Sequence, residues 1–160
     1  PADWKPLTYV SVPCSGKLAL ALAGGKDEGV YSAQATYDPA NPEDMKTPAV
    51  TEYTEALTKQ GLTDLQITGG IVSAGWGFGA IFAKGVELAD TVDRAGVMNA
   101  LYAMEGETIG LMREGVTGHT SNDADPWILE QLRIVHREGG QWVEASPMVD
   151  FDGKSNDFGG

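Results

Sequence analysis

The chain has 160 residues, with 11 Lys and Arg and 23 Asp and Glu side chains, which gives a formal charge of −12 at pH 7. This length suits one domain or two small lobes, and 42% hydrophobic residues with four Trp exclude a disordered tail. The acidic balance argues against a nucleic-acid or anionic-membrane partner, because both bind a basic surface. The single cysteine, Cys14, excludes an internal disulfide framework and a cysteine-rich zinc site.

The beginning of the chain shows a strand, a helix and a second strand. Residues 7–12 are apolar or β-branched and end at Pro13, which predicts a strand. The apolar run 17–23 is followed by two glycines and predicts a short buried helix. Residues 30–37 alternate loosely between apolar and polar side chains and predict the second strand.

The helix between Thr47 and Gly61 has the clearest sequence signals. Thr47 is a good N-cap, Pro48 suits the first helical position, and Gly61 suits the C-terminal stop. Three apolar residues recur at helical spacing between them: Val50, Tyr53 and Leu57. The segment is therefore predicted to form an amphipathic helix.

The rest of the chain contains further elements of both types. We predict a strand over 65–72, a helix over 76–89, a helix that Asp93 caps and that ends near 106, and a polar loop over 115–126. Near the end, we predict a β-hairpin from strands 128–136 and 141–149, joined by a turn at 138–140. This alternation indicates an α/β protein with a C-terminal β-hairpin.

Two patterns that suggest a cofactor or a metal have the wrong spacing. Residues 75–79 read Gly-Trp-Gly-Phe-Gly, which is not the G-x-G-x-x-G spacing of a dinucleotide site. Four residues near the end suggest a calcium loop: Asp150, Asp152, Gly153 and Asp157. That loop lacks its third Asp and the distal Glu, so a solvated tail is the better interpretation. We therefore expect no cofactor and no metal.

Side chains with nucleophilic chemistry are scattered along the chain. Cys14 follows a strand end, where a helix N-terminus stabilises a thiolate, but a small buried cysteine explains the position better. A triad assembled from Ser15, His119 and Asp123 lacks a nucleophile-elbow motif and is little better than chance. His119 and His136 have no second metal ligand at useful spacing. We expect no catalysis, with a hydrolase using Ser15 or Cys14 as the alternative.

Two further positions combine a functional side chain with glycine neighbours. Glu28 precedes Gly29 and an apolar strand. It is either a turn residue with a solvated side chain, or its carboxylate points into the space that the neighbouring glycine leaves open. Trp76 lies between Gly75 and Gly77 and is either a core residue or the wall of a pocket.

A series of short motifs runs along the chain from about Lys5 to Phe151. The motifs are Ser11-Val12-Pro13, Glu28-Gly29-Val30-Tyr31-Ser32, Asp38-Pro39 with Pro42, Lys59-Gln60-Gly61, Trp76-Gly77, Glu87-Leu88-Ala89, Asp93-Arg94 and Gly140-Gln141-Trp142-Val143. In this order they resemble the C-terminal half of a type I periplasmic solute-binding protein. Within that family they resemble the branched-chain amino acid (Leu/Ile/Val) binding proteins of ABC transporters. The family's Gly-Pro-rich strand near residues 108–112 survives only as Ile109-Gly110, and the family's first half is missing.

The resemblance implies a receptor that is periplasmic or extracellular, and tethered to the membrane if it is a lipoprotein. Such a receptor captures a small amino-acid-like solute in a cleft between two lobes and delivers it to an ABC permease, without catalysis. A sensory or regulatory ligand-binding domain of the same fold is the alternative. The chain begins with Pro1 and not Met, so we expect any signal peptide to lie upstream.

The resemblance also implies how the chain is organised. Residues 1–72 would form part of the second ligand-binding lobe, a three-layer α/β/α lobe of the periplasmic binding protein type I fold. Residues 73–114 would be helices of the other lobe, and residues 115–160 would form a loop, the C-terminal β-hairpin and a tail. Helices without their sheet expose an apolar face, so we expect a fragment that self-associates.

Four ligand-binding residues follow from the resemblance: Ser11, Ser15, Glu28 and Trp76. Glu28 would hold the ammonium group of the ligand, and such a charge-assisted hydrogen bond is worth about 1.5–3 kcal/mol. Ser11 or Ser15 would bind the carboxylate end. Trp76 would form a wall of the cleft.

Overall fold

The computed structural model describes residues 4–121 and 125–154 of the chain. Helices and strands mix along it in the order η1 (a 3-10 helix, Val12–Cys14), α1 (Lys17–Ala21), β1 (Tyr31–Gln34), η2 (a 3-10 helix, Asp44–Lys46), α2 (Pro48–Lys59), α3 (Asp64–Thr68), α4 (Ile71–Leu88), α5 (Arg94–Leu101), β2 (Glu105–Glu107), β3 (Gly118–His119), β4 (Gln131–Glu138), β5 (Gln141–Glu144) and β6 (Val149–Asp150). The predicted mixed α/β class is confirmed.

The strands form two antiparallel sheets. β4 pairs with β1, β5 and β6 in a four-stranded sheet, while β2 and β3 pair with each other. The predicted hairpin is confirmed as β4 and β5, with Arg137 opposite Trp142. Its turn needs glycine, because Gly139 and Gly140 have φ values of 57° and 77° in the left-handed region. The three-layer arrangement stays a prediction.

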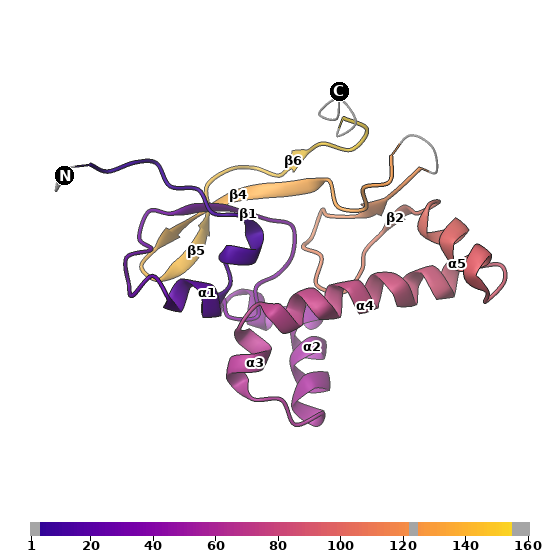
Figure 1. Cartoon of the computed structure of the whole chain (residues 1–160), viewed down its shortest axis with the longest axis horizontal. Helices are drawn as coiled ribbons and strands as arrows, with labels where there is room; N and C mark the ends of the chain where they lie inside the picture. The colour runs from indigo at the N-terminus through magenta and orange to yellow at the C-terminus, as the bar shows by residue number, and fades with distance from the viewer. Residues whose placement is uncertain (1–3, 122–124, 155–160) are drawn as a thin grey trace.

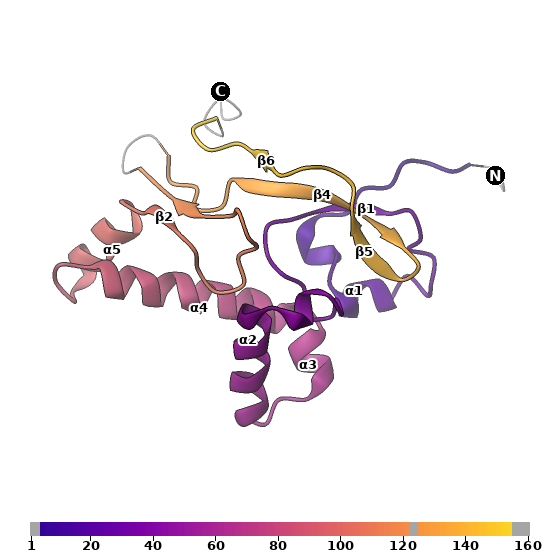
Figure 2. The same cartoon turned by 180° about the vertical axis from the view of Figure 1, so that it is seen from behind.

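The helix α4 is the longest helix among the described residues. In Figures 1 and 2 it runs along the longest dimension below the strands, with α2 and α3 side by side on the side of α4 away from the strands. The β4–β5 hairpin and α1 lie together at one end. This arrangement brings residues from the range 15–41 next to residues of the range 137–142.

Two apolar clusters form the core. One contains Val50, Tyr53, Ile67 and Leu111, and the other contains Met104, Ile109, Met112 and Val116. The consecutive residues Leu111 and Met112 therefore belong to different clusters, so this segment joins the helical part to the sheets. The Tyr53 hydroxyl donates to the Ile67 carbonyl at 2.7 Å, which fixes α2 against α3.

The capped helices begin as predicted. Thr47 accepts a hydrogen bond from the Val50 amide at 3.4 Å, and α2 begins at Pro48. Asp93 accepts one from the Gly96 amide at 2.8 Å at the start of α5. The predicted end of α5 near residue 106 is wrong, because the helix ends at Leu101 and β2 follows.

The predicted strand over 65–72 is wrong. This segment contains α3 and the beginning of α4, so α4 starts earlier than residue 76. The reason is a capping box, in which Thr63 and Gln66 satisfy each other's backbone amides and nucleate a helical turn. Residues 73–75, which separate the predicted strand from the predicted helix, consequently lie inside α4.

The beginning of the chain also differs from its predictions. Instead of a strand over 7–12, only a bridge between Tyr9 and Tyr31 forms, and Pro13 enters a 3-10 helix. The predicted helix over 17–23 ends at Ala21 and fully buries no side chain. Within the predicted polar loop 115–126, the short strand β3 pairs with β2.

The outer face of α4 is apolar. Ile71, Phe78 and Phe82 are 72%, 75% and 61% exposed. These residues recur at i, i+7 and i+11, which places them on one side of the helix. Across the described residues, no helix has both the length and the apolar character needed to cross a membrane.

Candidate functional site

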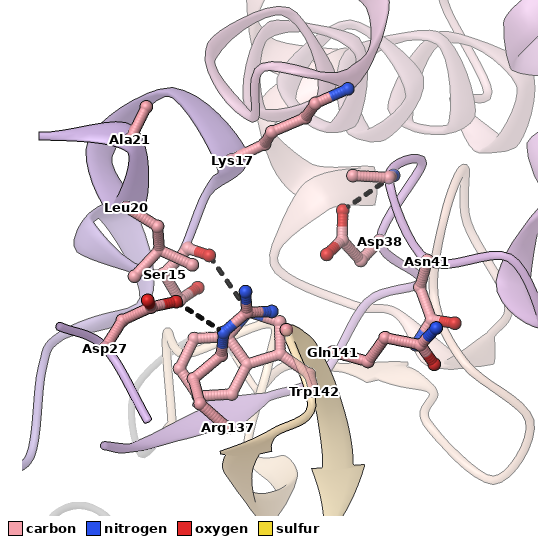
Figure 3. A pocket seen from close by; sticks show the side chains of 12 residues that line it. Ser15, Lys17, Leu20, Ala21, Asp27, Asp38, Asn41, Arg137, Gln141 and Trp142 are labelled. Atoms are coloured by element: carbon pink, nitrogen blue, oxygen red, sulfur yellow. Dashed lines mark hydrogen bonds and ion pairs between the residues drawn. The ribbon is translucent and has the colours of Figure 1, made fainter. Parts of the chain in front are cut away.

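A pocket of about 360 Å³ lies between α1, the loop after β1 and the β4–β5 hairpin (Figure 3). Its polar lining comes from Lys17, Asp27, Asp38, Asn41, Arg137 and Gln141. Apolar atoms are contributed by Leu20, Ala21 and Trp142. The pocket therefore offers both signs of charge beside an apolar wall.

One wall is a neutral, rigid unit built across the fold. Arg137 Nε donates to Asp27 Oδ2 at 2.9 Å, and these side chains are 13% and 16% exposed. The Arg137 guanidinium lies 5.2 Å from the centroid of the Trp142 ring, and the indole nitrogen donates to the Ser15 carbonyl at 3.0 Å. Each charged or polar group in this wall has a partner, so the wall shapes the pocket without adding net charge.

Asp38 contributes a carboxylate to the pocket lining, in addition to the wall formed by Asp27, Arg137 and Trp142. In Figure 3 its side chain points into the pocket, and its Oδ1 accepts the Ala40 amide at 2.9 Å. Burial raises the pKa of Asp38, and the charge of Asp44 raises it further, while the Ala40 hydrogen bond, Arg113 and Arg137 oppose the shift. The environment thus disfavours an unpaired charge on Asp38.

A buried ion pair holds the loop that carries Asp38. Arg113 Nη2 donates to both carboxylate oxygens of Asp44 at 2.9 and 2.7 Å. Asp44 also accepts the Asp38 amide at 2.7 Å, and the Arg113 guanidinium lies over the Tyr37 ring at 4.9 Å. The charge on Asp44 is therefore neutralised by Arg113 behind the pocket.

Lys17 is a cation at the rim of the pocket. Its Nζ donates to Thr68 Oγ1 at 3.2 Å and lies 3.8 Å from Asp64 Oδ2. The side chain is half exposed, so solvent screens its charge. Lys17 is thus engaged with α3 and not with Asp38.

Of the four residues predicted to bind ligand, Ser15 is the one that lines the pocket. Its hydroxyl donates to the Val12 carbonyl at 2.7 Å, and its own carbonyl accepts the Trp142 indole. Ser11 is exposed, and its hydroxyl contacts Cys14 Sγ at 3.7 Å. The two serines therefore do not converge on the pocket.

Glu28 and Trp76 lie outside the pocket lining. Glu28 is exposed, and its Oε1 accepts the Gly139 amide at 3.3 Å, so it lies at the outer edge of the hairpin turn. Trp76 packs edge-on against Tyr53, with ring centroids 5.5 Å apart. It also lies close to Gly110, where an added Cβ would approach its indole at 3.7 Å and Ala80 at 3.1 Å. The ligand-binding roles of Ser11, Ser15, Glu28 and Trp76 stay predictions.

Sequence reasoning did not single out four residues that shape the pocket: Asp27, Asp38, Arg137 and Trp142. Asp27 is the immediate neighbour of Glu28, and Trp142 belongs to the Gly140–Val143 motif, so weak signals existed for both. Asp38 belongs to the Asp38-Pro39 motif but was not predicted to face a pocket, and Arg137 is an ordinary charged residue in a strand. Their placement depends on contacts between distant parts of the chain.

The contacts of the nucleophilic side chains assemble no pair of a nucleophile and a base within the described residues. The Ser15 hydroxyl donates to a carbonyl, which does not accept a proton from it as a base would. His119 Nδ1 lies 3.0 Å from Asp152 Oδ1, His136 Nε2 lies 3.1 Å from Glu138 Oε2, and neither histidine lines the pocket. Cys14 is exposed and not buried as predicted. Asp123 of the suggested triad lies outside the described residues.

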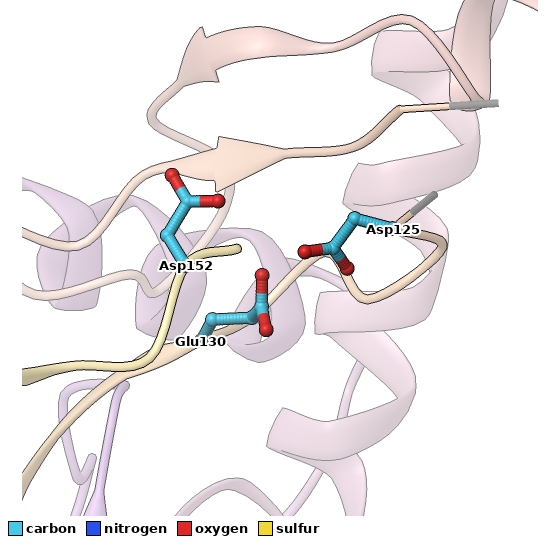
Figure 4. Close-up of side chains that lie close together, drawn as sticks. All are labelled: Asp125, Glu130 and Asp152. Carbon is cyan, nitrogen blue, oxygen red and sulfur yellow. The ribbon is translucent and has the colours of Figure 1, made fainter. Parts of the chain in front are cut away.

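A cluster of three carboxylates lies at the other end of the molecule (Figure 4). Oxygens of Asp125, Glu130 and Asp152 lie within 4.8 Å of one another. Asp125 accepts the Trp127 and Gly153 amides, both at 3.2 Å, which stabilises its charge. Asp152 is half-buried beside His119, so the prediction of a solvated tail is wrong at Asp152. Asp157 lies outside the described residues.

Solved structures share this fold, although no family model and no curated protein matches the chain. A branched-chain amino acid ABC transporter protein from Thermus thermophilus, solved with bound valine, is similar with a TM-score of 0.73 and 19% identity over 99% of the chain. A leucine-binding protein from Thermotoga maritima has a TM-score of 0.60 and 10% identity over 94%. A periplasmic binding protein type 1 from Bordetella pertussis has a TM-score of 0.51 and 16% identity over 87%.

The chain corresponds to only part of each of these proteins. It spans 43%, 39% and 38% of their lengths, respectively. Similarity at this level of identity establishes the fold. The predicted resemblance is thereby confirmed: the chain has the fold of about two fifths of a type I periplasmic binding protein of the branched-chain amino acid class.

Proposed function

We propose that this chain is part of the extracytoplasmic substrate-binding component of an ABC transporter and captures a small amino-acid-like solute without chemical change. The observation that carries the proposal is the fold shared over 99% of the chain with a transporter protein that holds valine. The pocket supports it, because charged and amide groups beside Leu20 and Trp142 suit a solute with polar and apolar parts.

The organisation implied by the resemblance belongs to the same proposal. Residues 1–72 contribute to one three-layer α/β/α lobe, residues 73–114 to the helices of a second lobe, and residues 115–160 to the C-terminal loop, hairpin and tail. The exposed apolar face of α4 supports this division, because such a face normally packs against another layer. The complete receptor would be periplasmic or extracellular and would release its solute to a membrane permease.

The proposal is tested by titrating L-valine and L-leucine into the 160-residue chain and measuring the heat of binding. Leu20→Arg fills the pocket and should abolish the heat, because Leu20 lines it. Leu22→Arg is the matched control, because Leu22 is the C-cap of the same helix, is 90% exposed and does not line the pocket. Absence of binding by the unmodified chain at millimolar solute would overturn the proposal. Equal binding by Leu20→Arg would move the site away from this pocket.

A further inference from the structure

The outer side of α4 carries an apolar stripe. Six exposed residues form it, and their spacing places them on one side of the helix: Ile71, Ala74, Gly75, Phe78, Gly79 and Phe82. The opposite side of α4 packs inside the chain, where Trp76 meets Tyr53 edge-on. Within the described residues, the stripe is therefore the side of α4 that is left open to solvent.

Two glycines of the stripe are not explained by packing within the described chain. Glycine disfavours the interior of a helix relative to alanine, so its presence there needs a reason. At Gly85 the reason is internal, because an added Cβ would lie 2.7 Å from the Leu101 side chain. At Gly75 and Gly79 an added Cβ would meet no atom within 4 Å. These two positions are instead open hollows beside the exposed phenylalanines of the stripe.

The order of large and small residues makes the stripe complementary to itself in the antiparallel direction. A two-fold axis between residues 76 and 77 would bring six residues of each copy into opposed pairs: Ile71 with Phe82, Ala74 with Gly79, and Gly75 with Phe78. Each Phe78 ring then enters a glycine hollow of the other copy, and small residues meet where the two helices approach. A two-fold interface requires this property, because one surface must fit itself.

The charge of the chain also favours pairing at this stripe. Residues 71–83 contain no charged side chain, and Lys84, the first charge after them, is neutralised by Glu87 at 2.7 Å. With a formal charge of −12, two copies repel each other when their acidic surfaces meet. At the stripe, two acidic chains can approach without bringing like charges together.

The stripe has enough apolar surface for a weak dimer. Ile71, Phe78 and Phe82 are 72%, 75% and 61% exposed. An aromatic side chain has about 150–250 Å² of surface, so these three side chains expose on the order of 400 Å² in one copy and about 800 Å² in a pair. The small residues between them bring the pair near the roughly 1,000 Å² that a specific interface needs. We therefore expect a dissociation constant in the micromolar range.

We propose that a second copy of this chain covers the stripe, in a two-fold symmetric dimer whose α4 helices cross antiparallel between residues 76 and 77. The phenylalanines of the stripe supply the apolar contact, and the glycines admit them. The inference goes beyond the proposed function and does not depend on it, because no residue of the stripe lines the pocket.

Sedimentation velocity on the 160-residue chain measures the association over a series of micromolar concentrations. Wild type should pass from monomer to dimer and not to larger species, because a two-fold interface closes on itself. Added salt should strengthen the dimer, since it screens the repulsion between two acidic chains. Phe78→Ala should raise the dissociation constant at least about tenfold, because it removes the ring that fills the hollow.

Gly75→Leu separates a fitted interface from general apolar association. The added leucine makes the stripe more apolar and favours the helix, but it fills the hollow that receives Phe78. The fitted dimer should therefore weaken at least about tenfold, whereas general apolar association would become tighter. Gly77→Leu is the matched control, because an added Cβ there also meets no atom within 4 Å and the residue lies outside the stripe. It should leave the dissociation constant unchanged.

Disulfide cross-linking tests the direction of the two helices. Cys14 is exposed, so it is first removed as Cys14→Ser. In that background, Ala74→Cys and Gly79→Cys are prepared as two separate proteins, mixed and oxidised. The antiparallel dimer predicts a cross-link between the two different variants, because Ala74 of one copy lies opposite Gly79 of the other. Intact mass distinguishes this product from a cross-link of either variant with itself.

Three results would overturn the inference. A wild type that stays monomeric at high micromolar concentration would assign the stripe to chain outside these 160 residues or to a different protein. Tighter association of Gly75→Leu would show that the contact is apolar but not fitted. Cross-links that join each variant to itself would indicate parallel helices. The valine titration is independent of all three results, so the proposed function is tested separately.

Discussion

Replacing Arg113 with alanine leaves the Asp44 carboxylate buried without its cation. Arg113 contacts both Asp44 oxygens, at 2.9 and 2.7 Å, and Asp44 is only 5% exposed. Asp44 cannot move out to water easily, because it also accepts the Asp38 amide. Removing one partner of such a pair costs about 3–5 kcal/mol, since the remaining charge is uncompensated. This is a large share of the roughly 5–15 kcal/mol that stabilises a typical domain.

The assay is urea denaturation followed by far-ultraviolet circular dichroism. A loss of about 3 kcal/mol lowers the folding equilibrium constant by about 150-fold, which shifts the midpoint clearly at unchanged slope. Lys46→Ala is the control, because its ion pair with Glu43 joins side chains that are 68% and 75% exposed. Losing that pair should cost less than about 1 kcal/mol after solvent screening.

A double variant separates the ion pair from simple loss of packing. Adding Asp44→Asn to Arg113→Ala removes the uncompensated charge, so the double variant should be more stable than Arg113→Ala alone. The reasoning would be refuted if Arg113→Ala cost no more than Lys46→Ala. It would also be refuted if neutralising Asp44 recovered no stability.

Three further outcomes are expected. Burial raises the pKa of Tyr53 to about 12, so the folded protein should lose stability as pH rises from about 10 to 12. Tyr53→Phe should remove this loss in alkaline melting curves. The same variant should cost about 1–2 kcal/mol of stability at pH 7, because it leaves the Ile67 carbonyl without its hydrogen bond. The raised pKa of Asp38 means that the folded state binds the proton more tightly than the unfolded state does. Asp38→Asn should therefore have a higher melting temperature than wild type at pH 7, and this difference should disappear as the pH falls toward 3.8. A difference in melting temperature that stays constant with pH would contradict this prediction. The apolar face of α4 should cause self-association in sedimentation velocity, and Phe78→Ser with Phe82→Ser should shift the chain to monomer; a monomeric wild type at micromolar concentration would exclude this.

Local signals in the sequence predicted those elements that local interactions stabilise. Thr47 with Pro48 identified the start of α2, and the paired glycines at 139 and 140 identified the hairpin turn, because caps and left-handed turns depend on a few adjacent residues. The run over 65–72 is apolar enough for either a strand or a helix. The capping box at Thr63 decided between them, and it lies just before that run.

The candidate site was less predictable for a physical reason. Ser15 was expected at the site and lines the pocket, but Trp142, which bonds to its carbonyl, is 127 residues away in the sequence. No pattern within one segment indicates such a contact. Trp76 was considered as a pocket wall because of its glycine neighbours, yet an added Cβ at Gly75 or Gly77 would meet no atom within 4 Å. Those glycines lie on open sides of α4 and do not line the pocket.

The ion pair between Asp27 and Arg137 joins residues separated by 110 positions, so the order of synthesis governs when the pocket can form. At roughly 5–20 residues per second, the ribosome needs about 5–20 s to produce that intervening length. Throughout this interval Asp27 and the Ser15 carbonyl lack their hairpin partners, and the pocket is incomplete. The pocket can therefore form only after the hairpin has emerged from the ribosome.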